Sequence, residues 1–195
     1  FLWNEYADWY IELAKVRLRS NAQSSPLPVL LHVLEQTLRL LHPFMPFVTE
    51  EVWQNLVQRL PKDPSRPQSI MMATYPVPSV SDHDDQAEEE MGLVIDVIKA
   101  IRNARAELKI DASKKIETII DAENYKPLIE GFVEAIRNLA RANPIQVYGD
   151  GEVLHTPPRT RVAVLNKARV ILPLEGVIDQ EAERRRVEKE QSELT

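Results

Sequence analysis

The sequence predicts a mainly α-helical protein: a helical bundle, followed by a small α+β unit and the start of a C-terminal coiled-coil arm. Three observations predict this class. Apolar residues recur at helical spacing through most of the first 110 residues, short runs rich in isoleucine and valine follow, and the last segment is almost entirely charged. We therefore expect domains at residues 1–110, 111–176 and 177–195.

The composition is that of a globular protein and excludes several classes. With 195 residues, 44% of them hydrophobic, the chain is long enough to bury a core. No apolar run of 18 or more residues is present, so we expect no membrane span and no membrane partner, and we take the cytoplasm as the default location. The absence of cysteine removes disulfide and thiolate chemistry. Residues 61–123 hold 8 basic and 13 acidic side chains and carry most of the net charge of −6, so a polyanion would have to bind elsewhere.

Residues 1–19 are predicted to form a helix with a wide apolar face. At about 100° per residue, side chains such as Leu2, Tyr6, Trp9 and Leu13 share an arc of about 220°, which only Arg17 interrupts. A helix that is apolar over so wide an arc must be covered from two sides, and this indicates a bundle.

Two more bundle helices and a proline-rich corner are predicted between residues 24 and 60. Leucines recur from Leu27 to Leu41, and Pro43 ends that helix, since the residue before a proline is pushed out of helical geometry. Pro46 suits the first turn of the next helix. We expect the corner to turn the chain, His42 to be structural rather than catalytic, and three side chains to plug the end of the bundle: Phe44, Met45 and Phe47.

The remaining elements are predicted from the change in period. Residues 61–86 are expected to be a connector with one extended segment against the bundle, and a helix from Glu88 to Leu108 is expected to complete the bundle. A helix from Tyr125 to Ala142 and four strands are predicted to form the α+β unit, the strands at residues 115–122, 144–148, 161–166 and 168–174.

The sequence offers no motif for autonomous catalysis. It has five glycines and no Gly-rich phosphate loop, nucleophile elbow or zinc-protease motif, and its histidines lack metal-ligand spacing. We therefore expect no catalytic residue, no metal site and no cofactor in this chain. Of the tryptophans, Trp9 is expected in the core, while Trp3 is a possible stacking platform for a base.

The polar strip of the first helix is the candidate binding surface. It combines amide, carboxylate and cationic groups, and its members are Asn4, Asp8, Glu12, Lys15 and Arg19, bordered by Ile11. Such a strip can read base edges while its cations contact phosphates. Pairing within the helix, for example of Glu12 with Lys15, is the simpler interpretation from the residues alone.

Three segments carry a resemblance to a known family: FLWNEYADWYIELAK, LEQTLRLLHPFMPFVTEEVWQNL and SIMMATYP. In this order they resemble the helical anticodon-binding domain of class I aminoacyl-tRNA synthetases for branched aliphatic amino acids. The corner LLHPFMPFVTEEVW occurs across the isoleucyl, leucyl and valyl enzymes. DWYIE and the terminal LPLEGVIDQEAERRRVEKE look like the valyl-tRNA synthetases, which end in a coiled-coil arm.

The resemblance implies a function in tRNA binding. The expected partners are tRNA(Val) and the rest of the synthetase chain, in an enzyme that is expected to be a monomer and to ligate valine to tRNA with ATP. ATP and Mg would belong to a catalytic domain absent from this sequence, so this chain alone is expected to be inactive. The arm is expected to contact phosphates through Arg184, Arg185, Arg186 and Lys189. The isoleucyl enzyme and a helical protein-interaction scaffold are the alternatives.

Overall fold

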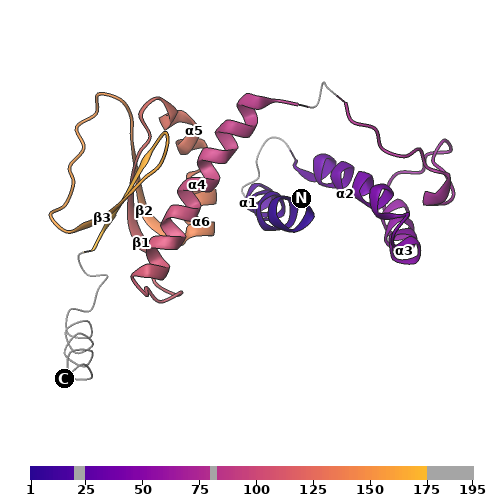
Figure 1. Cartoon of the computed structure of the whole chain (residues 1–195), viewed down its shortest axis with the longest axis horizontal. Helices are drawn as coiled ribbons and strands as arrows, with labels where there is room; N and C mark the ends of the chain where they lie inside the picture. Colours follow the sequence, from indigo (N-terminus) through magenta and orange to yellow (C-terminus); the bar gives the residue numbers. More distant parts are fainter. Residues whose placement is uncertain (20–24, 80–82, 175–195) are drawn as a thin grey trace, which may run out of the picture. The chain divides into compact units, whose positions relative to one another are not determined.

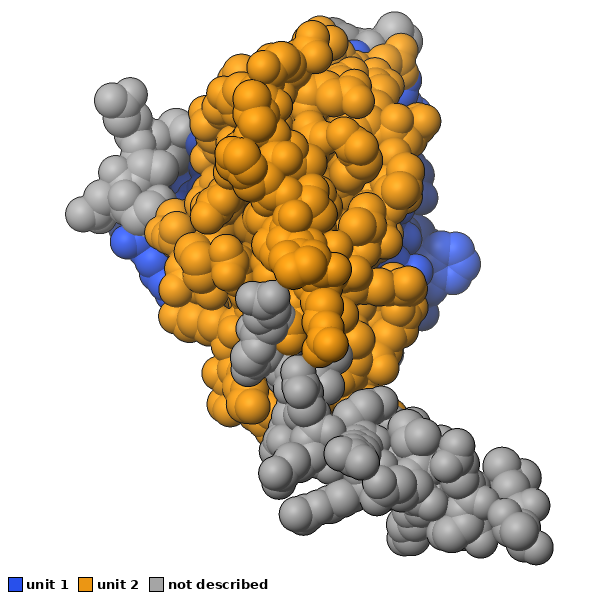
Figure 2. Space-filling view, turned by 90° about the vertical axis from the view of Figure 1, so that its left-hand side faces the viewer, with its two compact units in different colours: residues 1–83 blue, residues 84–195 orange. Residues whose placement is uncertain are grey.

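The computed structural model describes residues 1–19, 25–79 and 83–174 (Figure 1). The chain divides into two compact units, residues 1–83 and residues 84–195, which Figure 2 shows in different colours. The predicted coiled-coil arm at residues 177–195 lies outside the described residues.

The first helix of the chain changes its winding along its length. It begins as a π-helix, η1 (Leu2–Ile11), and continues as an α-helix, α1 (Glu12–Arg19). At its start the carbonyl of Phe1 accepts from the N–H of Glu5 at 3.0 Å and from that of Tyr6 at 3.3 Å. The predicted helix is confirmed, but its uniform α geometry is wrong. The apolar pattern did not reveal this because an arc of more than half the circumference fits both windings.

Helices α2 (Leu27–Leu41) and α3 (Pro46–Val57) pack against each other, and both were predicted. Pro46 stands in the first turn of α3, where its missing N–H costs no intrahelical bond. Leu38, Trp53 and Ile70 form a buried cluster, with Leu34, Leu56 and Val57 packed against it. Ile70 begins the short 3₁₀ helix η2 (Ile70–Met72), so the connector does contact the helices, as predicted.

The corner between α2 and α3 corrects one expectation. Phe44 is 81% exposed, Phe47 is 89% exposed and Met45 is also exposed, so these side chains do not plug the end of a bundle. The turn is instead closed by polar contacts: the backbone N–H of Phe44 donates to the carbonyl of Leu41 at 2.9 Å, and His42 Nδ1 lies 2.8 Å from Thr49 Oγ1. Hydrophobicity alone predicts that a side chain tends to be buried, not toward which neighbour it points.

The second unit is built on a four-stranded mixed sheet with the order β2-β1-β4-β3. Its strands are β1 (Ile116–Asp121), β2 (Ala142–Tyr148), β3 (Thr160–Val164) and β4 (Arg169–Pro173), which confirms all four predicted strands. β1 pairs with β2 in parallel, while β4 pairs with β1 and β3 in antiparallel. The central strands are buried along most of their length, as near-continuous apolar runs require.

Helix α4 (Asp85–Glu107) belongs to this second unit. Asp84 caps it, because its side chain accepts from the N–H of Ala87 at 3.0 Å. We expected this helix to complete the helical bundle, but within its unit it packs against β3, β4 and α6, and the helices lie on one side of the sheet (Figure 1). Its apolar pattern shows that the helix is covered; it contains no information about the covering element.

The predicted helix from Tyr125 to Ala142 is divided. A 3₁₀ turn, η4 (Glu123–Tyr125), leads into α5 (Lys126–Gly131), and α6 (Val133–Ala140) follows after Phe132. The N–H of Phe132 donates to the carbonyl of Ile129 at 3.0 Å, three residues back, which tightens the chain at the break. Gly131 weakens the helix at this point because glycine loses the most backbone freedom on folding.

Candidate nucleic-acid interface

The polar strip of the first helix faces solvent. Asn4 and Asp8 lie on η1, Lys15 and Arg19 lie on α1, and all four side chains are exposed. Ile11 and Glu12, at the junction of the two windings, are half-buried. The structure thus gives the candidate residues the accessibility that a binding surface needs.

One pair within the strip also forms the intrahelical contact that the simpler interpretation predicted. Lys15 Nζ lies 2.6 Å from Glu12 Oε1, and both side chains are accessible to solvent. An exposed pair of this kind contributes only about 0.3–0.5 kcal/mol. A phosphate or a base edge could therefore compete for Lys15 at little cost.

Opposite the strip, tyrosines hold the first helix in place. The Tyr6 hydroxyl donates to the carbonyl of Leu30 in α2 at 2.8 Å, and the Tyr6 ring stacks on Tyr10 with centroids 6.1 Å apart. Burial, and to a lesser degree Tyr10, raises the pKa of Tyr6, so its hydroxyl keeps its proton for this bond. The anchor fixes one side of the helix and leaves the other side to solvent.

The tryptophans separate into different roles. Trp3 is 81% exposed, so it is accessible to a stacking base, whereas Trp9 is half-buried and Leu13 is buried. Trp53 is 2% exposed and belongs to the core of its unit. Among these three tryptophans, only Trp3 is available as a platform for nucleic acid.

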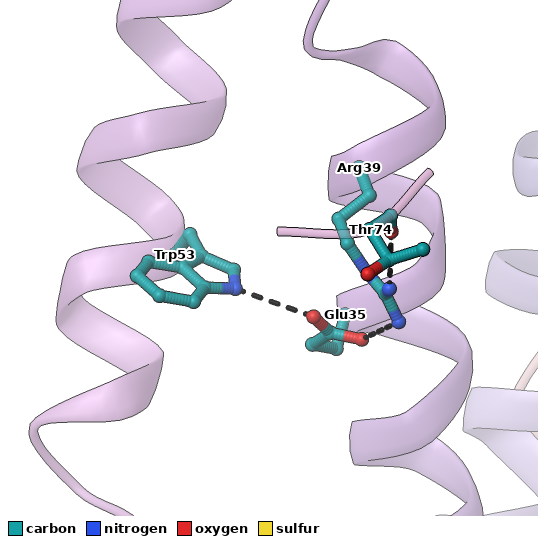
Figure 3. Close-up of polar contacts among 4 residues, drawn as sticks. All are labelled: Glu35, Arg39, Trp53 and Thr74. Carbon is teal, nitrogen blue, oxygen red and sulfur yellow. Dashed lines mark hydrogen bonds and ion pairs between the residues drawn. The ribbon is translucent and has the colours of Figure 1, made fainter. Parts of the chain in front are cut away.

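A polar network ties α2, α3 and the connector together (Figure 3). Glu35 Oε1 accepts from the indole N–H of Trp53 at 3.3 Å, and Glu35 Oε2 accepts from Arg39 at 2.7 Å. Arg39 also donates to the backbone carbonyl of Thr74 at 2.6 Å. This network was not predicted, although a carboxylate within the leucine run of α2 was a signal for it.

Glu50 holds the connector from the side of α3. Its Oε2 accepts from the Ser69 hydroxyl at 2.9 Å and from the N–H of Ile70 at 3.0 Å, and its Oε1 accepts from Gln54 at 2.7 Å. The bond from Gln54, together with those from Ser69 and Ile70, lowers the pKa of Glu50. Glu50 therefore fixes the connector against α3.

The second group of candidates belongs to the predicted arm. Arg184, Arg185, Arg186 and Lys189 lie outside the residues that the structure describes. Among the described helices, none is both long and apolar enough to span a bilayer.

Comparison with known proteins gives one family match and several relatives that share one name. Residues 1–120 match the family described as the anticodon-binding domain of tRNA ligase. The chain is 42% identical over 195 residues to a valine–tRNA ligase of Dehalococcoides mccartyi, covering 100% of this chain and 22% of the relative. It is 37% identical over 200 residues to that of Oceanobacillus iheyensis, with coverage of 100% and 22%, and 39% identical over 194 residues to that of Geobacillus stearothermophilus, with coverage of 97% and 21%.

These matches span about a fifth of the length of the curated relatives. The helical region that carries the exposed strip lies entirely within the matched residues 1–120. On this evidence from sequence and structure, the chain belongs to the family of anticodon-binding domains of tRNA ligases.

Proposed function

We propose that this chain is the anticodon-recognising, tRNA-binding part of a valine–tRNA ligase, in which it presents the polar strip of its first helix to the anticodon stem-loop of tRNA(Val). The observation that carries the proposal is the family match over residues 1–120, together with the valine–tRNA ligase relatives that align along the whole chain. The exposure of Asn4, Asp8, Lys15 and Arg19 supports it, because these side chains need no rearrangement to reach an RNA loop.

The chemistry of ligation belongs elsewhere in the proposed enzyme. Valine activation with ATP and Mg requires a catalytic domain, and we assign none of its residues to this chain. The proposed enzyme works as a monomer in the cytoplasm. Its terminal Arg184, Arg185 and Arg186 add phosphate contacts in this proposal, and tRNA affinity that survives reversal of these three charges would contradict that role.

Lys15→Ala and Asp8→Ala in the full-length enzyme are expected to lower the rate of tRNA charging roughly tenfold each, the effect of losing about one specific contact. Valine-dependent exchange of pyrophosphate into ATP should stay unchanged, because that reaction needs no tRNA. The measurement is charging kcat/KM for tRNA(Val) beside the exchange rate of the same preparation.

Arg59→Ala is the matched control, since it removes one exposed cation from the same unit outside the strip. Its charging rate should remain within about twofold of the wild type. Loss of both charging and exchange in the Lys15 and Asp8 variants would indicate misfolding, and unchanged charging in both would refute anticodon recognition by the strip.

A further inference from the structure

Charge is strongly polarised within the second unit. At one end, the start of α4 meets the turn between β3 and β4, where Lys167 pairs with Glu89. This end is acidic, and its three cations Lys126, Lys167 and Arg169 are all engaged with carboxylates. At the other end, the last turns of α4 and α6 meet the first residues of β1, β2 and β3. There the basic side chains gather: Arg102, Arg105, Lys109, Lys114, Lys115, Arg141, Arg159 and Arg161.

The turn from α4 to β1, residues 108–115, is held from within by arginine. Arg105 is 7% exposed and donates to the carbonyls of Asp111 at 2.9 Å and Arg141 at 3.3 Å. Arg141 in turn donates to the carbonyl of Ala112. Side-chain hydrogen bonds therefore hold the backbone of the turn, because two guanidinium groups satisfy backbone carbonyls that belong to separate elements.

Two acids of this end are engaged by neighbouring groups. Glu107 pairs with Arg161 at 2.8 Å. Asp111 accepts from the N–H of Ser113 at 2.7 Å and from its hydroxyl, and these bonds, helped by the charges of Lys114 and Arg105, lower the pKa of Asp111. Its carboxylate thus serves the backbone of the turn.

Lys109, Lys114 and Lys115 are exposed, and within the described residues none of the three has an ion-pair partner. The three lysines project from a turn whose backbone carbonyls accept from Arg105 and Arg141. Arg141 itself lies between α6 and β2 and, being exposed, adds a fourth positive charge.

Two of these cations occupy backbone positions that favour glycine. Lys109 follows the end of α4 with φ of 51°, and Arg141 follows the end of α6 with φ of 54°. A non-glycine residue in this left-handed region costs about 1–2 kcal/mol. A cation at a helix C-terminus regains about 0.3–1 kcal/mol from the helix dipole, which offsets part of that cost for Lys109 and Arg141. The helix dipole does not explain the presence of Lys114 and Lys115, because these residues lie beyond the end of the helix.

We propose that the basic turn, defined as Lys109, Lys114, Lys115 and Arg141, binds phosphates of the tRNA backbone as a contact separate from the polar strip of the first helix. This inference rests on the proposed function, because that function supplies the polyanion. Exposed lysines without ion-pair partners on a held backbone suit a phosphate backbone, since each contact releases counterions and carries no base specificity.

The test is the affinity of the full-length enzyme for tRNA(Val) at a series of salt concentrations. Lys114→Gln combined with Lys115→Gln should weaken binding roughly tenfold at low salt. The slope of log affinity against log salt should fall by about 1–2, since each lost phosphate contact contributes about 0.7–0.9. Lys114→Arg combined with Lys115→Arg keeps both charges and should restore both values.

Lys126→Gln combined with Lys167→Gln is the matched control. It removes the same net charge from the acidic end of the same unit, and it should leave the salt slope unchanged. Wild-type affinity and slope in the Lys114 and Lys115 glutamine variant would overturn the inference while leaving the proposed function intact. So would equal losses in the control. A wild-type enzyme that binds no tRNA would overturn both.

Discussion

Replacing Trp53 with alanine should lower the free energy of unfolding of residues 1–83 by about 3–5 kcal/mol. The indole is 2% exposed and packs with Leu38 and Ile70, so its removal opens a cavity where α2, α3 and η2 meet. It also removes the N–H that Glu35 accepts. Hydrogen exchange of the full-length enzyme should show α2 and α3 amides losing protection, and tRNA binding should fall with them.

Two substitutions bracket this result. Trp3→Ala removes the same side chain from a position that is 81% exposed, and its effect on stability should stay within about 0.5 kcal/mol. Trp53→Phe keeps most of the buried apolar surface but loses the bond to Glu35, so its effect should be intermediate. Equal effects of the two alanine variants would show that Trp53 does not lie in a core.

Ile98→Ala should destabilise residues 84–174 by about 2–5 kcal/mol. Ile98 is fully buried in α4, within the unit where that helix packs against β3, β4 and α6. Amides of β1 and β4 should therefore lose protection from hydrogen exchange in the full-length enzyme, while those of α2 and α3 should keep theirs.

The same experiment tests the assignment of α4 to its unit. If α4 stabilised the helices of residues 1–83 instead, α2 and α3 amides would lose protection and the sheet would keep it. Asp96→Ala is the control on the exposed side of α4, and its effect should stay within about 0.5 kcal/mol.

The elements that could be predicted are those with local causes. Pro43 and Pro46 restrict the backbone of their own and the preceding residue, so the end of α2 and the start of α3 follow from the sequence. The strands follow for a similar reason, since Ile119, Ile120 and Val170 belong to short β-branched runs bounded by turn residues.

The features that could not be predicted depend on partners distant in sequence. The pattern of α4 required a cover but did not identify β4, which lies some 60 residues later, as part of it. Phe44 and Phe47 are as apolar as core residues, yet the polar closure of the turn by His42 and Thr49 leaves them outside.

The exposed residues of the candidate site could be predicted from the sequence, whereas the contact that holds the first helix in place could not. A polar strip of Asn4, Asp8, Lys15 and Arg19 follows from helical spacing even though the winding changes along the helix, because the strip is narrow and the apolar face is wide. The bond from Tyr6 to Leu30 joins residues 24 apart, and no local pattern indicates it.

The order of strands in the sheet affects how the chain folds while the ribosome is making it. β1 is paired on both sides only when β4 has been made, and β4 begins about 60 residues after α4 ends. At roughly 5–20 residues per second, a ribosome needs roughly 3–12 s to cover that interval. During this interval the apolar face of α4 is not yet covered by β4, whereas the helices of residues 1–83 have already been made. Residues 84–174 thus complete their fold after the helices of residues 1–83 have been made, and during that interval they expose apolar surface that a chaperone can bind.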